Sequence, residues 1–293
     1  MIEIISHLLK EISLLNEVSE LPFYVSFNRN FNFFVFGNRE EFYQVKVSSE
    51  RPLREEYEAL RIAHQAIPRN VPQPVGLYQK GGIEILICRG IRHKKVKSLQ
   101  TQGHIIQEEI KAILKGSKVF FREENPSLPH MQRLMTACDH FKNHPLWLAM
   151  RDWLGNLDPR LVNSLPHIKQ HGDLTLYNMG VAGNKLIIFD WEDFGKISIP
   201  GFDLCCLAVN SVTRFSPVGI ARVLERSAYP KEVMDIIACY CKELPLDQET
   251  FFNLYPIYLF YFLYLKNRYG YSPEIIRICE KLLAAVLEKP VKC

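Results

Sequence analysis

The chain has 293 residues, a net charge of +4 and 47% hydrophobic residues, a composition typical of a globular protein with a sizeable core. So small a positive excess does not indicate a nucleic-acid-binding protein, which needs a concentrated basic face. Its eight cysteines lack the regular spacing of a disulfide scaffold, so we expect reduced thiols in the core and a cytoplasmic protein.

The first twenty residues predict an amphipathic helix, because Ile5, Leu8 and Leu9 fall on one apolar stripe. Acidic residues Glu3 and Glu11 stand where a signal peptide would carry basic ones. No small-residue cleavage site follows, so we do not expect a signal peptide.

Residues 21–88 predict a small, mostly antiparallel sheet with one inserted helix. The alternating, aromatic-rich segments separated by turns are 21–28, 31–38, 41–47, 76–78 and 83–88. Residues 51–66 return to helical spacing, and the prolines that follow force an extended segment.

After residue 90 the chain is predicted to be mainly helical. The expected helices cover about 105–116, 130–142, 145–155, 201–213, 216–227, 230–242, 247–268 and 273–288. The very apolar run 251–265 falls short of the roughly 20 residues of a membrane span, so we expect a buried helix there. The predicted fold class is α+β, with a β-rich lobe at 1–90 and a helical lobe at 91–293.

A stretch from His171 to Leu204 carries the chemistry. Asp173 precedes the amide of Asn178 by five residues, and Asp190 ends the apolar run 185–189 after a predicted tight turn. An ionised Asp can orient a hydroxyl group and take its proton, while Asn and Asp are hard oxygen ligands for magnesium. The Asp–x4–Asn spacing is that of the protein-kinase catalytic loop, so the pattern points to phosphoryl transfer.

The stretch resembles the aminoglycoside phosphotransferase and choline-kinase-like family, which is similar in fold to protein kinases. The resemblance rests on His171-Gly172-Asp173, Asn178, Asp190-Trp191-Glu192, Pro200 and Phe202-Asp203-Leu204. It implies a bilobal kinase-like fold, with Asp173 as catalytic base, Asn178 and Asp190 as magnesium ligands, and Asp203 as an acid that pins the catalytic loop. The Asp-Trp-Glu sequence in place of Asp-Phe-Gly argues against a protein kinase proper, as does Gly172 in place of Arg.

Lys46 is the predicted phosphate-binding lysine, because it alternates with Val45 and Val47 on the third strand. Glu56 on the following helix is its predicted partner, with Glu55 as an adjacent competitor. The alternative interpretation is that Lys46 is an exposed strand lysine without a role in phosphate binding.

Three further segments have both a functional and a structural interpretation. The nucleotide-covering loop 28–32 contains no glycine, so Asn30 and Asn32 either cradle phosphate or only form a turn. The basic stretch 89–97 either attracts an acidic acceptor or is a solvated loop, which we favour. The tyrosines at every third position of 255–264 suggest an aromatic cation site, but a buried helix fits them better.

These patterns predict an ATP- and Mg²⁺-dependent phosphotransferase acting on a hydroxyl group of a small molecule or saccharide, with GTP as the alternative donor. The competing hypothesis is a pseudokinase, a kinase-like binding module without turnover, which the glycine-free loop favours and the intact Asp173 opposes. A protein hydroxyl as acceptor is disfavoured because no Ala-Pro-Glu segment follows Asp190. The sequence leaves the acceptor and the oligomeric state open.

Overall fold

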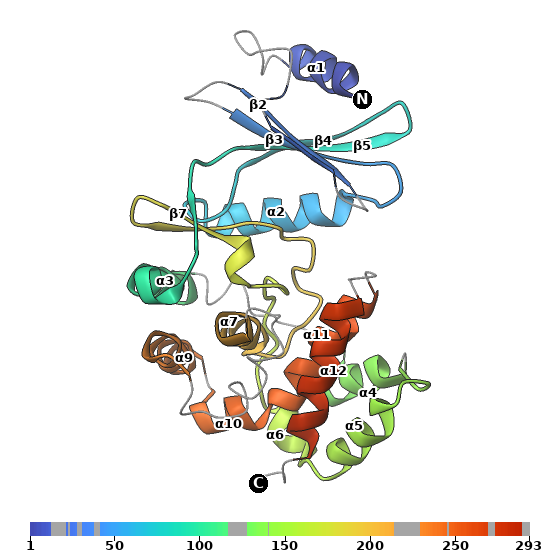
Figure 1. The fold of residues 1–293 in the computed structure, drawn as a ribbon, viewed down its shortest axis with the longest axis vertical. Helices are drawn as coiled ribbons and strands as arrows, with labels where there is room; N and C mark the ends of the chain where they lie inside the picture. Colours follow the sequence, from blue (N-terminus) through green and yellow to red (C-terminus); the bar gives the residue numbers. More distant parts are fainter. Residues whose placement is uncertain are drawn as a thin grey trace. The chain divides into compact units, whose positions relative to one another are not determined.

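The computed structural model describes residues 1–12, 22, 24–27, 31–37, 42–116, 128–139, 141–213, 229–244, 246–268 and 273–288 (Figure 1). The chain divides into two compact units. The first comprises Met1–Lys94 with Gly180–Glu192, and the second comprises Lys95–Met179 with Asp193–Cys293.

This division differs from a cut at residue 90 in two ways: the first unit extends to Lys94, and it includes Gly180–Glu192, most of a later hairpin and the residues that follow it. The side-chain amide of Asn70 donates to the carbonyl oxygen of Leu186 at 2.7 Å, and Ile188 N–H donates to the carbonyl oxygen of Asn70 at 2.8 Å. These hydrogen bonds join segments more than 100 residues apart. A single boundary along the sequence therefore cannot place both segments in the same unit.

The first unit contains a five-stranded sheet with the order β1-β2-β3-β5-β4, in which every neighbouring pair is antiparallel. This confirms the predicted antiparallel, β-rich region. Its strands are β1 (Tyr24–Phe27), β2 (Asn32–Gly37), β3 (Phe42–Ser48), β4 (Pro74–Lys80) and β5 (Ile83–Arg89).

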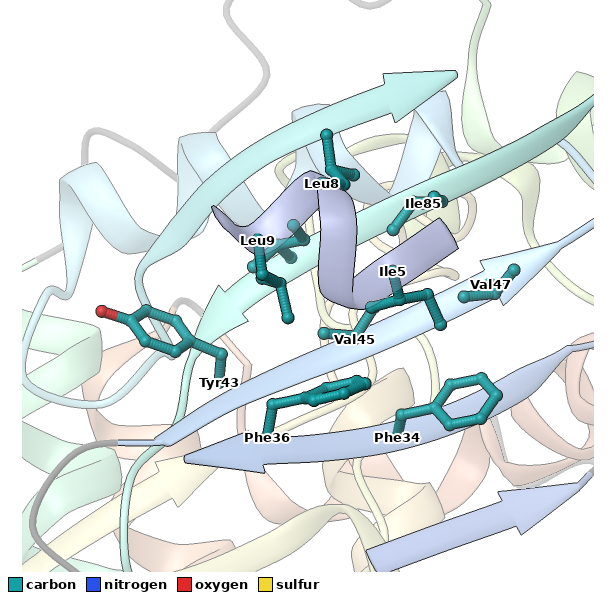
Figure 2. Close-up of a cluster of buried hydrophobic side chains, with 10 residues drawn as sticks. Ile5, Leu8, Leu9, Phe34, Phe36, Tyr43, Val45, Val47 and Ile85 are labelled. Atoms are coloured by element: carbon teal, nitrogen blue, oxygen red, sulfur yellow. The ribbon is translucent and has the colours of Figure 1, made fainter. Parts of the chain in front are cut away.

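Helices α1 (Ile2–Glu11) and α2 (Arg54–Ala66) lie on opposite faces of this sheet (Figure 1). Side chains alternate between the two faces of a strand, so Val45 and Val47 face α1 while Lys46 between them faces α2. The predicted stripe of α1 closes the core on its side. Figure 2 shows the buried side chains that α1 and the sheet contribute to this core: Ile5, Leu8, Leu9, Phe34, Phe36, Tyr43, Val45, Val47 and Ile85.

The predicted hairpin before Asp190 consists of β7 (Met179–Ala182) and β8 (Lys185–Ile188), with β6 (Lys94–Lys95) on the other edge of β7. The chain reverses at Gly183, whose φ of +62° lies in the left-handed region that glycine adopts without strain. The hairpin delivers Asp190 two residues after β8.

The second unit is helical, as predicted. Its described helices are α3 (Leu99–Gly116), α4 (His130–Asp139), α5 (Leu146–Gly155), α6 (Pro159–Asn163), the 3₁₀ turn η1 (Leu176–Asn178), α7 (Phe202–Thr213), α9 (Lys231–Glu243), α10 (Gln248–Asn253), α11 (Tyr255–Arg268) and α12 (Pro273–Leu287). The helix predicted at 216–227 lies outside the described residues.

One predicted helix, 247–268, is wrong as a single element, because α10 ends at Asn253 and α11 begins at Tyr255. Pro256 has no N–H group and its ring collides with a carbonyl four residues earlier, so a continuous helix cannot pass through it. Tyr255, Tyr258 and Tyr261 are buried in α11, as expected of a core helix. No helix among the described residues is both long and apolar enough to cross a membrane.

Candidate active site

Lys46 stands at the centre of an acidic cluster in the first unit. Its Nζ atom lies 2.7 Å from Oε2 of Glu56, 3.4 Å from Oε2 of Glu192 and 3.6 Å from Oδ1 of Asp190. Glu56 on α2 is buried whereas Glu55 is exposed, so the structure selects Glu56 as the partner of Lys46. The sequence predicts Glu56 as the carboxylate partner of Lys46. The structure adds Glu192 as a second carboxylate beside the lysine.

Arg51, which lies just before α2, extends the cluster, because its Nη1 atom is 3.1 Å from Oε2 of Glu192. Glu192 therefore contacts two cations, and its position two residues after Asp190 was the available signal for its role. Carboxylate oxygens of Glu56, Asp190 and Glu192 all lie within 4.8 Å of one another. Three hard oxygen ligands this close are suited to a divalent cation.

The charges in the Lys46 cluster do not balance. Among the residues that the structure describes, three carboxylates face two cations, so one negative charge remains when all are ionised. Burial alone would lower the pKa of Lys46, but the carboxylates of Asp190, Glu56 and Glu192 outweigh burial and raise it. Burial raises the pKa of Glu56 to about 7, although the charge of Lys46 opposes this shift. The nearby carboxylates of Asp190 and Glu192 contribute to the rise of this pKa. The lysine is therefore held as a cation, and the surplus charge falls on the acids.

Asp190 has an unusual backbone. Its φ is 59°, and it is the one non-glycine residue with a positive φ among the residues that the structure describes. Backbone strain of this kind persists where the surrounding structure enforces it and is concentrated at functional sites. Its side chain is also the most exposed of the cluster, at 38%, so it is the carboxylate best placed to meet a ligand.

Asp173 lies in the second unit, on the loop that leads into η1. The Nδ2 atom of Asn178 donates to the backbone oxygen of Asp173 at 2.9 Å and to its Oδ2 atom at 3.2 Å. The structure thus brings the predicted base and the predicted amide ligand into direct contact. Both hydrogen bonds use the nitrogen of the Asn178 amide, and its carbonyl oxygen is the atom that could bind a metal.

Asp203 pins this loop, as the resemblance implied. Its Oδ2 atom accepts from the N–H of His171 at 2.7 Å, and its Oδ1 atom accepts from the N–H of Gly172 at 2.8 Å. Burial raises the pKa of Asp203, whereas the two backbone donors and His171 favour its ionised form. Gly172 has a φ of +89°, and a Cβ atom there would lie 2.6 Å from Cβ of Asp193, so only glycine fits.

Lys266 of α11 is a component that sequence analysis missed. Its Nζ atom lies 2.9 Å from Oδ1 of Asp173, and its side chain is 5% exposed. It follows a long apolar run in the sequence, so the pattern alone predicts an exposed lysine at the end of a helix. The available signal was its spacing of three from Leu263 and four from Phe262, which are both buried.

The predicted site residues therefore form two clusters, one in each unit: Lys46, Glu56 and Asp190 in the first, and Asp173 and Asn178 in the second. The loop at 28–30, including Asn30, lies outside the described residues, while Asn32 begins β2. In the basic stretch 89–97, all five lysines and arginines are exposed.

A model of the phosphotransferase enzyme family matches residues 29–235. Among curated proteins, none matches this sequence significantly. A solved structure of a thermostable mutant of the aminoglycoside phosphotransferase APH(4)-Ia, in ternary complex with AMP-PNP and hygromycin B, is similar with a TM-score of 0.63 and 12% identity. That alignment covers 97% of this chain and 99% of the other.

Two kinases of small alcohols are similar at the same level. The choline kinase LicA from Streptococcus pneumoniae has a TM-score of 0.59 and 16% identity over 96% of this chain and 99% of its own. An ethanolamine kinase from Plasmodium vivax has a TM-score of 0.59 and 14% identity over 98% of this chain and 88% of its own. Likenesses at such identities concern the fold, and they confirm the predicted α+β, kinase-like architecture.

Proposed function

Because the chain belongs to the phosphotransferase enzyme family, we propose that it transfers the γ-phosphoryl group of ATP to a hydroxyl group of a small molecule or saccharide. Nucleotide binding is assigned to the Lys46 cluster and activation of the acceptor to the Asp173 cluster. Both assignments agree with the roles that the sequence resemblance implies.

One observation carries the proposal: the carboxylate of Asp173 is held at both oxygens, by Asn178 and by Lys266. A general base needs a fixed carboxylate within reach of the proton that it removes. The side chain of Asp173 is still 14% exposed, so a hydroxyl group can reach it.

The acidic surplus around Lys46 supports a divalent cation as the companion of the nucleotide. We assign the charged ligand to Asp190 and the neutral ligand to Asn178, with Glu192 close to Asp190. When bound, Mg²⁺ would neutralise phosphate oxygens and polarise the γ-phosphoryl group. Lys46, held by Glu56, would bind phosphate oxygens of the nucleotide.

In the proposed reaction the acceptor oxygen forms a bond to the γ-phosphorus while the bond from that phosphorus to the β,γ-bridging oxygen breaks. The proton of the acceptor hydroxyl passes to the carboxylate of Asp173, and ADP leaves with the bridging oxygen. Lys46 balances negative charge on the nucleotide throughout. Asp173 orients the hydroxyl before transfer and holds its proton afterwards.

The proposal is tested by ADP release from ATP with a panel of acceptors: choline, ethanolamine, hygromycin B, glucose and N-acetylglucosamine. We expect Mg²⁺-dependent release with at least one class of acceptor and loss of release in EDTA. Asp173→Asn should lower kcat by on the order of 10²–10⁴-fold, because the base is lost. Asp190→Ala should instead abolish the rise in melting temperature that ATP with Mg²⁺ produces.

The same measurements separate an enzyme from a pseudokinase. A binding module would be stabilised by the nucleotide with Mg²⁺ and release no ADP with any acceptor. Full activity in Asp173→Asn would remove the assignment of the base while leaving the family membership intact.

A further inference from the structure

Lys266 is a buried cation beside the predicted base, and no motif assigns it a role. It lies near the end of α11, and its side chain is 5% exposed. Lysine is rarely buried unless it is paired, because removing an ammonium group from water is costly. One partner of Lys266 is Oδ1 of Asp173, which lies 2.9 Å from its Nζ atom.

The surroundings of the ammonium strengthen this contact. The ring of Phe262, four residues earlier on α11, has its centroid 5.0 Å from Nζ of Lys266, within the range of a cation–π contact. An apolar neighbour excludes water, and charges attract more strongly where water is excluded. Lys266 and Asp173 therefore interact as a desolvated pair and not as a surface salt bridge.

The pair distinguishes the two oxygens of Asp173. Oδ1 is buried and, among the described residues, has no hydrogen-bond partner of good geometry, so its contact with Lys266 is electrostatic. Oδ2 accepts the hydrogen bond from Asn178 and retains a further lone pair. With Oδ1 turned inward, Oδ2 is the oxygen left for the acceptor hydroxyl.

We propose that Lys266 is a positioning residue for phosphoryl transfer, which holds Oδ1 of Asp173 inward so that Oδ2 faces the acceptor hydroxyl. The inference rests on the proposed function, in which Asp173 is the general base. It adds a residue 93 positions after Asp173 to the catalytic arrangement. Lys266 acts through Asp173 and touches neither the nucleotide nor the metal in this proposal.

A purely structural role is the competing explanation, in which the pair only fastens α11 to the loop. The two roles differ in what they change. A fastening role alters stability, whereas a positioning role alters kcat in a chain that remains folded. The second unit offers a control pair, because His144 of the segment before α5 contacts Glu280 of α12 at 2.9 Å and shares no residue with the Lys266–Asp173 pair.

The test compares the full-length wild type with Lys266→Met, Lys266→Gln and Glu280→Gln. The probe is ATP with Mg²⁺ and the panel acceptor that gives the fastest ADP release. We expect Lys266→Met to lower kcat by on the order of 10²-fold, the effect of misplacing a catalytic group by about 1 Å, with KM for ATP changed less than about threefold. Melting temperature reports folding, and Glu280→Gln is expected to keep the wild-type kcat.

Lys266→Gln removes the charge and keeps a polar side chain, so it carries the test if Lys266→Met does not fold. A lowered kcat in a folded variant supports the proposal. A wild-type kcat in either folded variant overturns it, as does an equal fall of kcat in Glu280→Gln. Absence of ADP release by the wild type counts against the proposed function itself, which separates that failure from a failure of Lys266.

Discussion

The two clusters of this chain are built on opposite electrostatic plans. The Lys46 cluster has three carboxylates for two cations and retains a surplus negative charge. In the Asp173 cluster, each acid has its own partners: the Lys266 ammonium and the Asn178 amide for Asp173, and two backbone N–H groups for Asp203. Among the described residues, the first cluster thus retains an uncompensated negative charge, whereas the acids of the second face a cation or backbone donors.

This difference shows how a phosphotransferase can separate two demands. A nucleotide with its metal brings charge of both signs, so its binding region must remain electrostatically unsaturated. A base must instead keep one orientation, so its carboxylate is best fully held. Three experiments, in order of expected effect, challenge this contrast.

The largest effect is expected from Lys46→Met. The variant leaves Glu56, Asp190 and Glu192 without their shared cation, and breaking a buried pair in this way costs roughly 3–5 kcal/mol of unfolding free energy. Urea unfolding measures this loss, and a thermal-shift titration measures the loss of nucleotide affinity.

Lys80→Met is the control for Lys46→Met, because Lys80 is a partly exposed lysine of the same sheet, with its Nζ atom 2.9 Å from Oε2 of Glu11. Its pair is screened by solvent, so Lys80→Met should keep nearly the wild-type stability. Equal losses in the two variants would contradict the view that the Lys46 cluster depends on its central cation.

Gly172→Ala should disturb the held geometry of the Asp173 loop. The new Cβ atom would meet Asp193, and the backbone has a φ of +89° that alanine tolerates poorly. We expect a loss of about 2–3 kcal/mol in unfolding free energy, with a fall in kcat. Gly183→Ala shares the positive φ but has no atom within 4 Å, so the difference between the two variants isolates the collision. A larger loss in Gly183→Ala would show that the collision is relieved by movement of Asp193.

The smallest effect is an opposite pH dependence of stability in the two units. Glu56 has a pKa raised by burial from 4.5 to about 7, so its contribution is lost as pH rises through that window. His130 is stacked on His167, with ring centroids 3.6 Å apart. Burial first, and then this neighbour, lowers the pKa of His130 from 6.5 to about 4, so its contribution is lost as pH falls through that window.

Melting temperature against pH should therefore change slope in opposite senses in Glu56→Gln and His130→Gln. Each contribution is on the order of 1 kcal/mol. Parallel profiles for both variants and the wild type would rule out these two groups as the source of the pH dependence.

Much of the fold followed from local pattern. The alternating strands and the stripe of α1 each repeat over a few residues, so their period is legible in the sequence. The predicted helix 247–268 failed at Pro256, where a single residue interrupts an apolar run. The division of the chain into units also differed from the linear boundary, because Asn70 binds the β7–β8 hairpin from a distant position.

The candidate site divides in the same way. Asp173, Asn178 and Asp190 are predicted because their types and spacing match the demands of phosphoryl transfer. The choice of Glu56 over Glu55 depended on burial, since both residues lie in the first turn of α2. Arg51 and Glu192 could be joined only by folding, because they are 141 positions apart.

The sequence by itself determined the kinase-like order of strands and helices in this protein. It could do so because secondary structure and catalytic loops are encoded by neighbours along the chain. The tertiary structure alone decided which charges meet: Glu192 with Lys46, and Lys266 with Asp173. The physical reason is that an ionised side chain is stable in a protein interior only beside its counter-charge, and that partner is set by packing between distant segments.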